Sequence, residues 1–231
     1  MNWRERLQER ESATHFVVEG RLAVERLQAS NYEIEKVVKI GVDLTREEAS
    51  GLLGFHFHRG YLAIARKPEP AALSEFGSGS IVVLPEIADP GNLGAIIRNT
   101  AALGGSGIIT GRGASPFNAK AVRASAGTLF QLPVRQSPDL LEDIRELAKT
   151  RILIGASLSQ NSIPLSQLTD IKRPIVLLLG PEDFGLTPAI EATCHHLVHL
   201  PMAREIDSLN VASASAIFLH EFRQDFRVTR H

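Results

Sequence analysis

Three loops of the sequence carry polar side chains that could do chemistry, and each loop follows an apolar stretch typical of a buried strand. In a parallel sheet, ligands bind beyond the carboxyl ends of the strands. Side chains in these loops are therefore expected to converge on one site. The loops span residues 89–98, 180–186 and 201–210, and the last of them ends in the polar pair Ser208 and Asn210.

The triplet Ser208-Leu209-Asn210 has two interpretations. It lies where a polar loop, entered through Pro201, becomes a segment with helical spacing. Ser and Asn are favoured at helix starts because their side-chain oxygens accept hydrogen bonds from the free N–H groups of the first turn. A helix cap is the simple interpretation, and a binding role is the alternative.

Familiar nucleotide and triad motifs are incomplete. No G-x-G-x-x-G follows a predicted strand, and residues 180–187 have the spacing of a phosphate loop but carry Leu186 where that loop requires Lys. Ser208 has Asp207 beside it, yet no His stands at a recognisable spacing. ATP, NAD and a Ser-His-Asp mechanism are therefore disfavoured.

A metal site is also disfavoured. The candidate ligands are Cys194, His195, His196 and His199. Adjacent side chains on a strand point to opposite faces, and no second cluster completes a tetrahedral set. We therefore expect no bound metal.

The composition is that of a globular protein, and 231 residues suit one domain of ordinary size plus a smaller one. No run approaches the roughly 18 consecutive apolar residues of a membrane helix. The N-terminus lacks the apolar core of a secretory signal. The single cysteine, Cys194, cannot form an intramolecular disulfide, so a cytoplasmic location is expected.

A net charge of −1 argues against a protein that coats nucleic acid, because such binding needs many cations that meet phosphates. A local basic patch stays compatible with that balance. One cation-rich segment contains Arg98, Arg112, Lys120, Arg123 and Arg135. A solvated face is its simpler interpretation.

Residues 16–66 predict a small α/β module. The expected strands span residues 16–20, 34–40 and 60–65, with a helix over 21–28. Thr45 and Glu48 fit a capping box, in which each side chain bonds the other residue's backbone N–H. That pattern predicts a short helix ending at Leu53.

Residues 67–80 read KPEPAALSEFGSGS and have no periodicity. Such a composition predicts a linker that is stiff at its Pro end and loose at its Gly/Ser end. We therefore predict a small domain over residues 1–67, a linker over 68–80 and a second domain over 81–231.

A regular series of strands and helices follows the linker. The expected strands span residues 81–84, 108–109, 151–156, 175–179 and 197–200. The expected helices span residues 93–103, 118–124, 138–150, 187–192 and 210–226. Wholly apolar strands that alternate with helices predict an α/β fold with a mostly parallel sheet and helices on both faces.

Three motifs in this series resemble those of the SpoU/TrmH branch of the SPOUT methyltransferases. They are NLGAIIRNTAALG, LLLGPEDFGL and LPMAREIDSLNVASASA, at residues 92–104, 177–186 and 200–216. They stand in the family's order and at suitable spacing. The segment ASAGTLF at residues 124–130 also resembles the family's intervening element.

The resemblance implies a fold that composition does not reveal. The parallel SPOUT sheet would end in a deep trefoil knot made by the C-terminal segment, whereas pattern reasoning alone predicts an unknotted sheet because knots are rare. A homodimer packed through the knotted region is also implied. Residues 1–67 resemble the small L30e-like α/β domain of many relatives, with His58-Arg59-Gly60-Tyr61 at a similar strand entry.

The resemblance further implies the activity. Enzymes of this branch move the methyl group of S-adenosylmethionine to a ribose 2′-hydroxyl of tRNA or rRNA, so structured RNA is the expected partner. Arg98 matches the principal catalytic residue. The other matching polar residues are Asn92, Glu182, Ser208 and Asn210, and the residues that would hold the adenosyl part are Gly180, Leu200, Leu209 and nearby Ile206.

Two details qualify this picture. Residues six apart do not share a helix face, so Asn92 is expected to act from the loop that precedes the helix carrying Arg98. Relatives commonly have Asn-Glu-Gly where this chain has Pro181-Glu182-Asp183. The missing glycine predicts a stiffer or reshaped loop.

Alternatives stay open for both the role of Arg98 and the function. Arg98 either accepts the hydroxyl proton, against the usual expectation that a guanidinium stays protonated, or remains a cation that grips a phosphate and orients the ribose. The alternative functions are a non-catalytic RNA-binding or ribosome-assembly protein on the same fold and a SPOUT enzyme that methylates a base. The sequence names neither the RNA nor the nucleotide.

Overall fold

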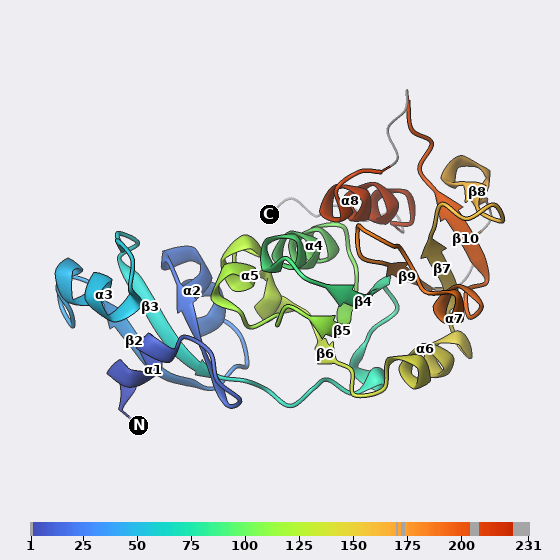
Figure 1. The fold of residues 1–231 in the computed structure, drawn as a ribbon. Helices are drawn as coiled ribbons and strands as arrows, with labels where there is room; N and C mark the ends of the chain where they lie inside the picture. Colours follow the sequence, from blue (N-terminus) through green and yellow to red (C-terminus); the bar gives the residue numbers. More distant parts are fainter. Residues whose placement is uncertain (1, 170, 172–173, 204–207, 224–231) are drawn as a thin grey trace, which may run out of the picture. The chain divides into compact units, whose positions relative to one another are not determined.

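The computed structural model describes residues 2–169, 171, 174–203 and 208–223 (Figure 1). The chain divides into two compact units. The first contains residues 1–69, 90–98 and 114–131, and the second contains residues 70–89, 99–113 and 132–231. No helix within the described residues is long and apolar enough to cross a bilayer.

A three-stranded antiparallel sheet in the order β1-β3-β2 lies at the centre of the first unit. Its strands are β1 (His15–Glu19), β2 (Ile34–Lys39) and β3 (Tyr61–Arg66). The unit's complete helices are α1 (Trp3–Glu9), α2 (Arg21–Gln28), α3 (Arg46–Leu53), α5 (Ala119–Ala124) and the 3-10 helix η2 (Thr128–Gln131). The strands and helices predicted for residues 16–66 are confirmed, and α1 was not predicted.

The predicted capping box fixes the start of α3. Thr45 Oγ1 accepts a hydrogen bond from the Glu48 N–H at 3.1 Å, and Glu48 Oε2 accepts one from the Thr45 N–H at 2.8 Å. The helix ends at Leu53, where Gly54 takes a left-handed conformation with φ of 74°. Both ends of α3 therefore follow directly from the sequence.

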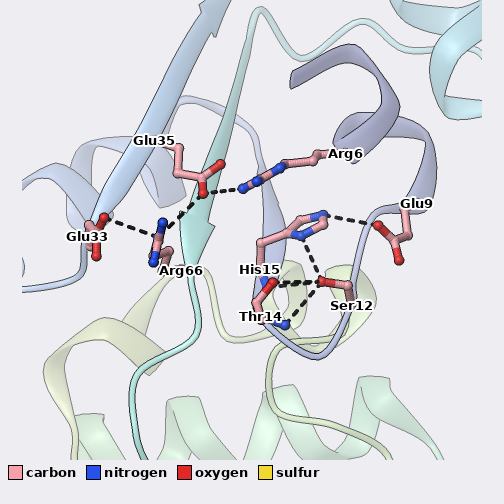
Figure 2. A network of polar contacts seen from close by, with 8 residues as sticks. All are labelled: Arg6, Glu9, Ser12, Thr14, His15, Glu33, Glu35 and Arg66. Atoms are coloured by element: carbon pink, nitrogen blue, oxygen red, sulfur yellow. Dashed lines mark hydrogen bonds and ion pairs between the residues drawn. The ribbon is translucent and has the colours of Figure 1, made fainter. Parts of the chain in front are cut away.

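Polar contacts hold α1 against the sheet of the first unit (Figure 2). Arg6 on α1 pairs with Glu35 on β2, and Arg66 on β3 lies 3.5 Å from the same carboxylate. At the other end of α1, Glu9 Oε2 lies 3.6 Å from Nε2 of His15. His15 is an almost completely buried residue of β1, so this contact joins the end of α1 to the sheet.

A seven-stranded sheet in the order β6-β5-β4-β9-β7-β10-β8 forms the second unit, and all of its strand pairs are parallel. The strands are β4 (Ile81–Ile87), β5 (Gly107–Gly113), β6 (Val134–Gln136), β7 (Ile152–Ala156), β8 (Ile163–Pro164), β9 (Ile175–Leu179) and β10 (His196–His199). The predicted parallel sheet is confirmed, although β6 and β8 were not predicted. The last strand in sequence, β10, lies between β7 and β8.

Helices cover both faces of this sheet. They are α6 (Leu140–Ala148), α7 (Pro188–Glu191) and α8 (Val211–Glu221), with the 3-10 helices η1 (Leu73–Glu75) and η3 (Leu165–Gln167). Ile144 of α6 and Ile190 of α7 share one apolar core with strand residues such as Val176. Helix α8 lies on the opposite face (Figure 1).

The last helix is shorter than predicted. It was expected over residues 210–226, but α8 ends at Glu221 and Phe222 is its C-cap, with φ of −88° and ψ of 1°. Residues 224–226 of the expected helix lie outside the described residues. Sequence spacing alone therefore overextended this element.

The glycine-rich end of the predicted linker is held by one buried arginine, which corrects the expectation that it is loose. Arg151 donates hydrogen bonds to the carbonyl oxygens of Gly79 at 2.7 Å and Phe76 at 3.2 Å, and to that of Gly77. The Phe76 ring also belongs to the core of the second unit. Composition suggested flexibility because it could not show these partners.

Cations of the basic segment mostly face acids. In the second unit, Arg112 lies 3.8 Å from Glu86, and Arg135 Nε lies 2.6 Å from Asp143. The hydrogen bond that Arg135 donates to Asp143 raises the pKa of Arg135. These two arginines therefore contribute little unpaired positive charge.

Gly94→Ala is expected to destabilise the protein. Helix α4 (Pro90–Ala102) carries Gly94, where an added Cβ would lie 2.3 Å from the carbonyl oxygen of Ala121 and 2.6 Å from Cβ of Ala124 on α5. Overpacking of this kind costs about 1–3 kcal/mol. Urea denaturation would measure the loss.

Gly51→Ala in α3 is the matched control. Among the described residues, no atom outside its chain neighbours and the nearby backbone of α3 lies within 4 Å of the Cβ that it would add, and Ala is the better helix former by roughly 1 kcal/mol. This variant is expected to be as stable as the parent protein or more so. Equal stability of the two variants would contradict the close approach of α4 and α5.

Candidate functional site

A cavity of about 470 Å³ opens at the carboxyl ends of β7, β9 and β10 in the second unit. Its walls come from the loops that follow these strands and from the first turns of α8. The volume falls within the range of small-molecule sites, and the location is the one expected for parallel sheets. The lining residues predicted from the sequence are Gly180, Glu182, Leu200, Ser208 and Leu209.

Two glycines close the loop that follows β9. A Cβ at Gly180 would lie 2.2 Å from the carbonyl carbon of Gly185. Gly185 itself has φ of 66°, which glycine adopts without strain, and its N–H donates to Pro181 O at 3.0 Å. The loop is therefore a tight turn whose two ends touch.

Glu182 joins this turn to the start of α8. Its Oε1 accepts hydrogen bonds from Asn210 Nδ2 and from the Val211 N–H, each at 3.1 Å. Asn210 Oδ1 accepts from the N–H groups of Ala212 at 3.0 Å and Ser213 at 3.3 Å. The cap interpretation is thus confirmed for Asn210.

Ser208 has a different place from Asn210. It lines the cavity, and the cap contacts seen among the described residues of α8 come from Asn210. Each interpretation therefore applies to one residue of the triplet. Asn210 caps α8, and Ser208 lines the cavity.

A second anchor of α8 was not predicted. Asn99 Nδ2 donates to the carbonyl oxygen of Ala212 at 2.8 Å and to Ser215 Oγ at 3.0 Å. Ser215 is completely buried. The first two turns of α8 are therefore held by side chains from two other segments of the second unit, Glu182 and Asn99.

The loop after β7 supplies cavity residues that sequence reasoning missed. Ser157, Leu158 and Ser159 follow the strand directly, so the rule about carboxyl ends of strands could have found them. Ser157 Oγ donates to Glu191, another lining residue. Ser159 Oγ is buried and has no hydrogen-bond partner among the described residues. An unpartnered buried hydroxyl is costly, which suits a site that a ligand completes.

Asn92 and Arg98 lie on α4, in the part that belongs to the first unit. The expectation that Asn92 acts from a preceding loop is wrong, because α4 begins at Pro90 and includes Asn92 in its first turn. Proline suits the first helical position, where its fixed φ is favourable and its missing N–H is not needed. Asn92 is half-buried and Arg98 is exposed.

Ile206 was predicted to contact the adenosyl group, and it lies outside the described residues. Among the residues that are described, no three His, Cys, Asp or Glu side chains are close enough to share a metal ion. His195 Nδ1 instead accepts the Leu153 N–H at 3.0 Å, and burial raises the pKa of Cys194 to about 11. His195 therefore binds the backbone of β7, and Cys194 packs against the core of the second unit.

The cavity walls combine apolar and acidic groups. Leu158, Leu200 and Leu209 provide apolar surface, and the carboxylates of Glu182 and Glu191 stand beside it. Together with the unpartnered Ser159 hydroxyl, this set suits a ligand with an apolar ring system, polar edges and a positive centre.

Comparisons with known proteins identify the family to which the chain belongs. A profile described as the SpoU rRNA Methylase family matches residues 79–220. A Mycobacterium avium protein named as an uncharacterized tRNA/rRNA methyltransferase is 31% identical over 224 residues, which cover 92% of this chain and 71% of that protein.

Solved structures show the same fold. The AdoMet-bound rRNA methyltransferase from Sinorhizobium meliloti superposes with a TM-score of 0.84 at 26% identity, covering 95% of this chain and 92% of that one. The SpoU methyltransferase AviRb from Streptomyces viridochromogenes, in complex with AdoMet, gives 0.79 at 25% identity, covering 96% and 97%.

Removing either side chain of the Glu182–Asn210 pair is expected to destabilise the second unit. Glu182→Ala and Asn210→Ala should each lower the free energy of unfolding by about 1 kcal/mol, because each leaves N–H groups of α8 without their acceptor. The double variant should lose less than the sum, since the two residues share one network.

Asp183→Ala is the matched control for this pair. It removes an exposed carboxylate from the same turn and should change stability by no more than about 0.5 kcal/mol. Urea denaturation compares the variants. Strict additivity of Glu182→Ala and Asn210→Ala would contradict a shared cap.

Proposed function

Because the chain belongs to the SpoU rRNA Methylase family, we propose that it transfers a methyl group from S-adenosylmethionine to a ribose 2′-hydroxyl of tRNA or rRNA. That it is an RNA methyltransferase of this family, with S-adenosylmethionine as methyl donor, follows from the family and its AdoMet-bound relatives. The ribose as acceptor is the proposed step. The observation that carries it is the cavity that unites the second and third motifs through Glu182 and the start of α8.

The residues of the cavity fit this methyl donor. Leu200 and Leu209 would contact its apolar face, and Ser159 Oγ would gain the hydrogen-bond partner that it lacks among the described residues. Gly180 lets the backbone approach closely, because a side chain there would meet Gly185. When bound, the donor supplies a methyl group on a positively charged sulfur, which makes the methyl electrophilic without a metal.

The remaining task of the protein is to position the ribose oxygen and remove its proton. Orientation of reacting groups can supply about 7–11 kcal/mol of barrier reduction. Ser208 faces the cavity and would orient the ribose or its phosphate. Asn210, whose amide is engaged in the cap, would act by holding the loop that carries Ser208.

Arg98 has two alternative roles in this proposal. As a base it would accept the proton of the 2′-hydroxyl. As a cation it would grip a phosphate and orient the ribose while water takes the proton. The family resemblance favours the first role, and Asn92 would assist from the first turn of α4.

The resemblance also supports an organisation of the protein that we retain as a proposal. The L30e-like domain comprises residues 1–67, the linker 68–80 and the SPOUT domain 81–231. The C-terminal segment would form a trefoil knot, and two copies would pair through it in the cytoplasm. Structured RNA would be bound by the dimer.

Label transfer tests the activity. The protein, incubated with methyl-labelled S-adenosylmethionine and unmodified tRNA or rRNA, is expected to label RNA at a linkage that resists alkaline hydrolysis, because a 2′-O-methyl group prevents attack on the phosphodiester. Label at an alkali-cleavable position would indicate base methylation. Absence of label on every RNA would favour a non-catalytic RNA-binding protein.

Ser208→Ala is expected to lower the methyl-transfer rate about tenfold or more, because one oriented hydrogen bond to the reacting groups is lost. Ser213→Ala, at an exposed position of α8 that does not line the cavity, is the matched control and should keep the parent rate. Single-turnover kinetics would measure both. Equal rates for Ser208→Ala and the parent protein would show that Ser208 has only a structural role.

Arg98→Lys separates the two roles of the arginine. If Arg98 is the base, the variant should lose about 100-fold in rate and show a changed dependence of rate on pH, because a lysine has a different pKa and geometry. Single-turnover rates across a range of pH provide the measurement. A variant that retains most of the activity would rule out Arg98 as the base.

A further inference from the structure

One buried carboxylate in the first unit is contacted by three arginines from distant parts of the sequence. Glu19 ends β1, and its side chain is 0% exposed. Arg10 pairs with its Oε1, while Nη1 of Arg59 and Nη1 of Arg123 lie 3.4 Å and 3.7 Å from its Oε2. The arginines come from the end of α1, the loop before β3 and helix α5.

This cluster carries more positive charge than Glu19 can balance. Guanidinium groups stay protonated in proteins, so three cations surround one anion. Their side chains are 31%, 40% and 41% exposed, and therefore each presents part of its guanidinium to solvent. Burial of Glu19 aligns the three groups and leaves two positive charges in excess.

A cavity of about 410 Å³ adjoins the cluster. It is lined by Glu9, Arg10, Glu11, Phe55, Asn118, Ala119, Lys120 and Arg123. Of the two acids, Glu11 lies 2.8 Å from Lys67, and Glu9 faces His15 (Figure 2). Lys67 offsets the carboxylate of Glu11, so Glu9 can cancel only one of the two excess positive charges of the arginines.

The backbone of Arg10 is strained in a way that suits this arrangement. Its φ of 64° and ψ of −41° lie outside the regions that non-glycine residues prefer. Glycine would adopt this conformation more readily, yet an arginine occupies the position and its guanidinium also lies 5.0 Å from the centre of the Phe55 ring. Strain of this kind is often retained at binding sites.

We propose that Arg10, Arg123 and Lys120, organised by Glu19 and Arg59, bind a phosphate group of the RNA backbone. The planar fork of arginine matches phosphate oxygens, and paired guanidiniums give the strongest such contacts. The site shares no residue with the cavity of the second unit. It rests on the proposed function, because the phosphodiester is that of the RNA substrate.

Arg123→Gln tests the site on the full-length protein. It is expected to weaken binding of an unmodified tRNA transcript about tenfold. The slope of log affinity against log salt concentration should fall by about 1, since one phosphate contact and its released counterion are lost. Fluorescence anisotropy over a series of KCl concentrations measures both quantities. An unchanged slope would overturn the proposal.

Two further variants act as controls. Arg46→Gln removes one exposed cation from α3 of the same unit and is expected to change neither affinity nor slope. Arg123→Lys keeps the charge but loses the fork, so it should keep the slope and bind about threefold more weakly. If melting curves show that Arg123→Gln is unfolded, Lys120→Gln, at an exposed position that lines the cavity, replaces it with the same expected fall in slope.

Calorimetry separates RNA from a small phosphate. In one outcome, the parent protein binds inorganic phosphate, Arg123→Gln abolishes that binding, and the slope of log RNA affinity against log salt concentration is unchanged. That outcome would assign the site to a free anion and overturn the RNA proposal. The affinity for S-adenosylmethionine should not change in Arg123→Gln. The parent protein could methylate no RNA while Arg123→Gln still lowers the salt slope of RNA binding. That result would support this phosphate site and refute the proposed activity.

Discussion

The hydrogen bonds that Glu182 accepts from the start of α8 are the contact on which the cavity depends. A helix terminus leaves four N–H groups without partners, and these must be satisfied where the helix is buried. Here part of that need is met by a side chain from a loop that lies 28 residues earlier. The hydrogen bonds at the start of α8 therefore determine where the second and third motif loops meet. The cavity lies between these two loops.

Much of this architecture follows from local patterns. The buried apolar strands Ile152–Ala156 and Ile175–Leu179 and the capping box at Thr45 are strong signals, because each depends on a few neighbouring residues. The motif residues Glu182 and Ser208 were found by resemblance and not by periodicity. The structure places both at one cavity, although they are separated by a loop of which residues 204–207 lie outside the described part.

The features that escaped prediction depend on partners distant in sequence. Strands β6 and β8 are too short for a periodic signal and are defined by pairing with β5 and β10. Arg151 could not be linked to the glycine-rich segment, because its backbone acceptors have no sequence signature. Glu19 looked like the end of a strand, and only the fold shows that three arginines reach it.

The place of β10 in the sheet has a consequence for synthesis of the chain. Strand β7 pairs on one side with β9 and on the other with β10, and within the described residues β10 is the one strand that pairs with β8. A nascent chain that has not yet released residues 196–199 from the ribosome therefore presents an open apolar strand edge, which is prone to pair with other chains. Completion of the sheet therefore waits until β10 has been made, although its neighbours β7 and β8 precede it in the chain.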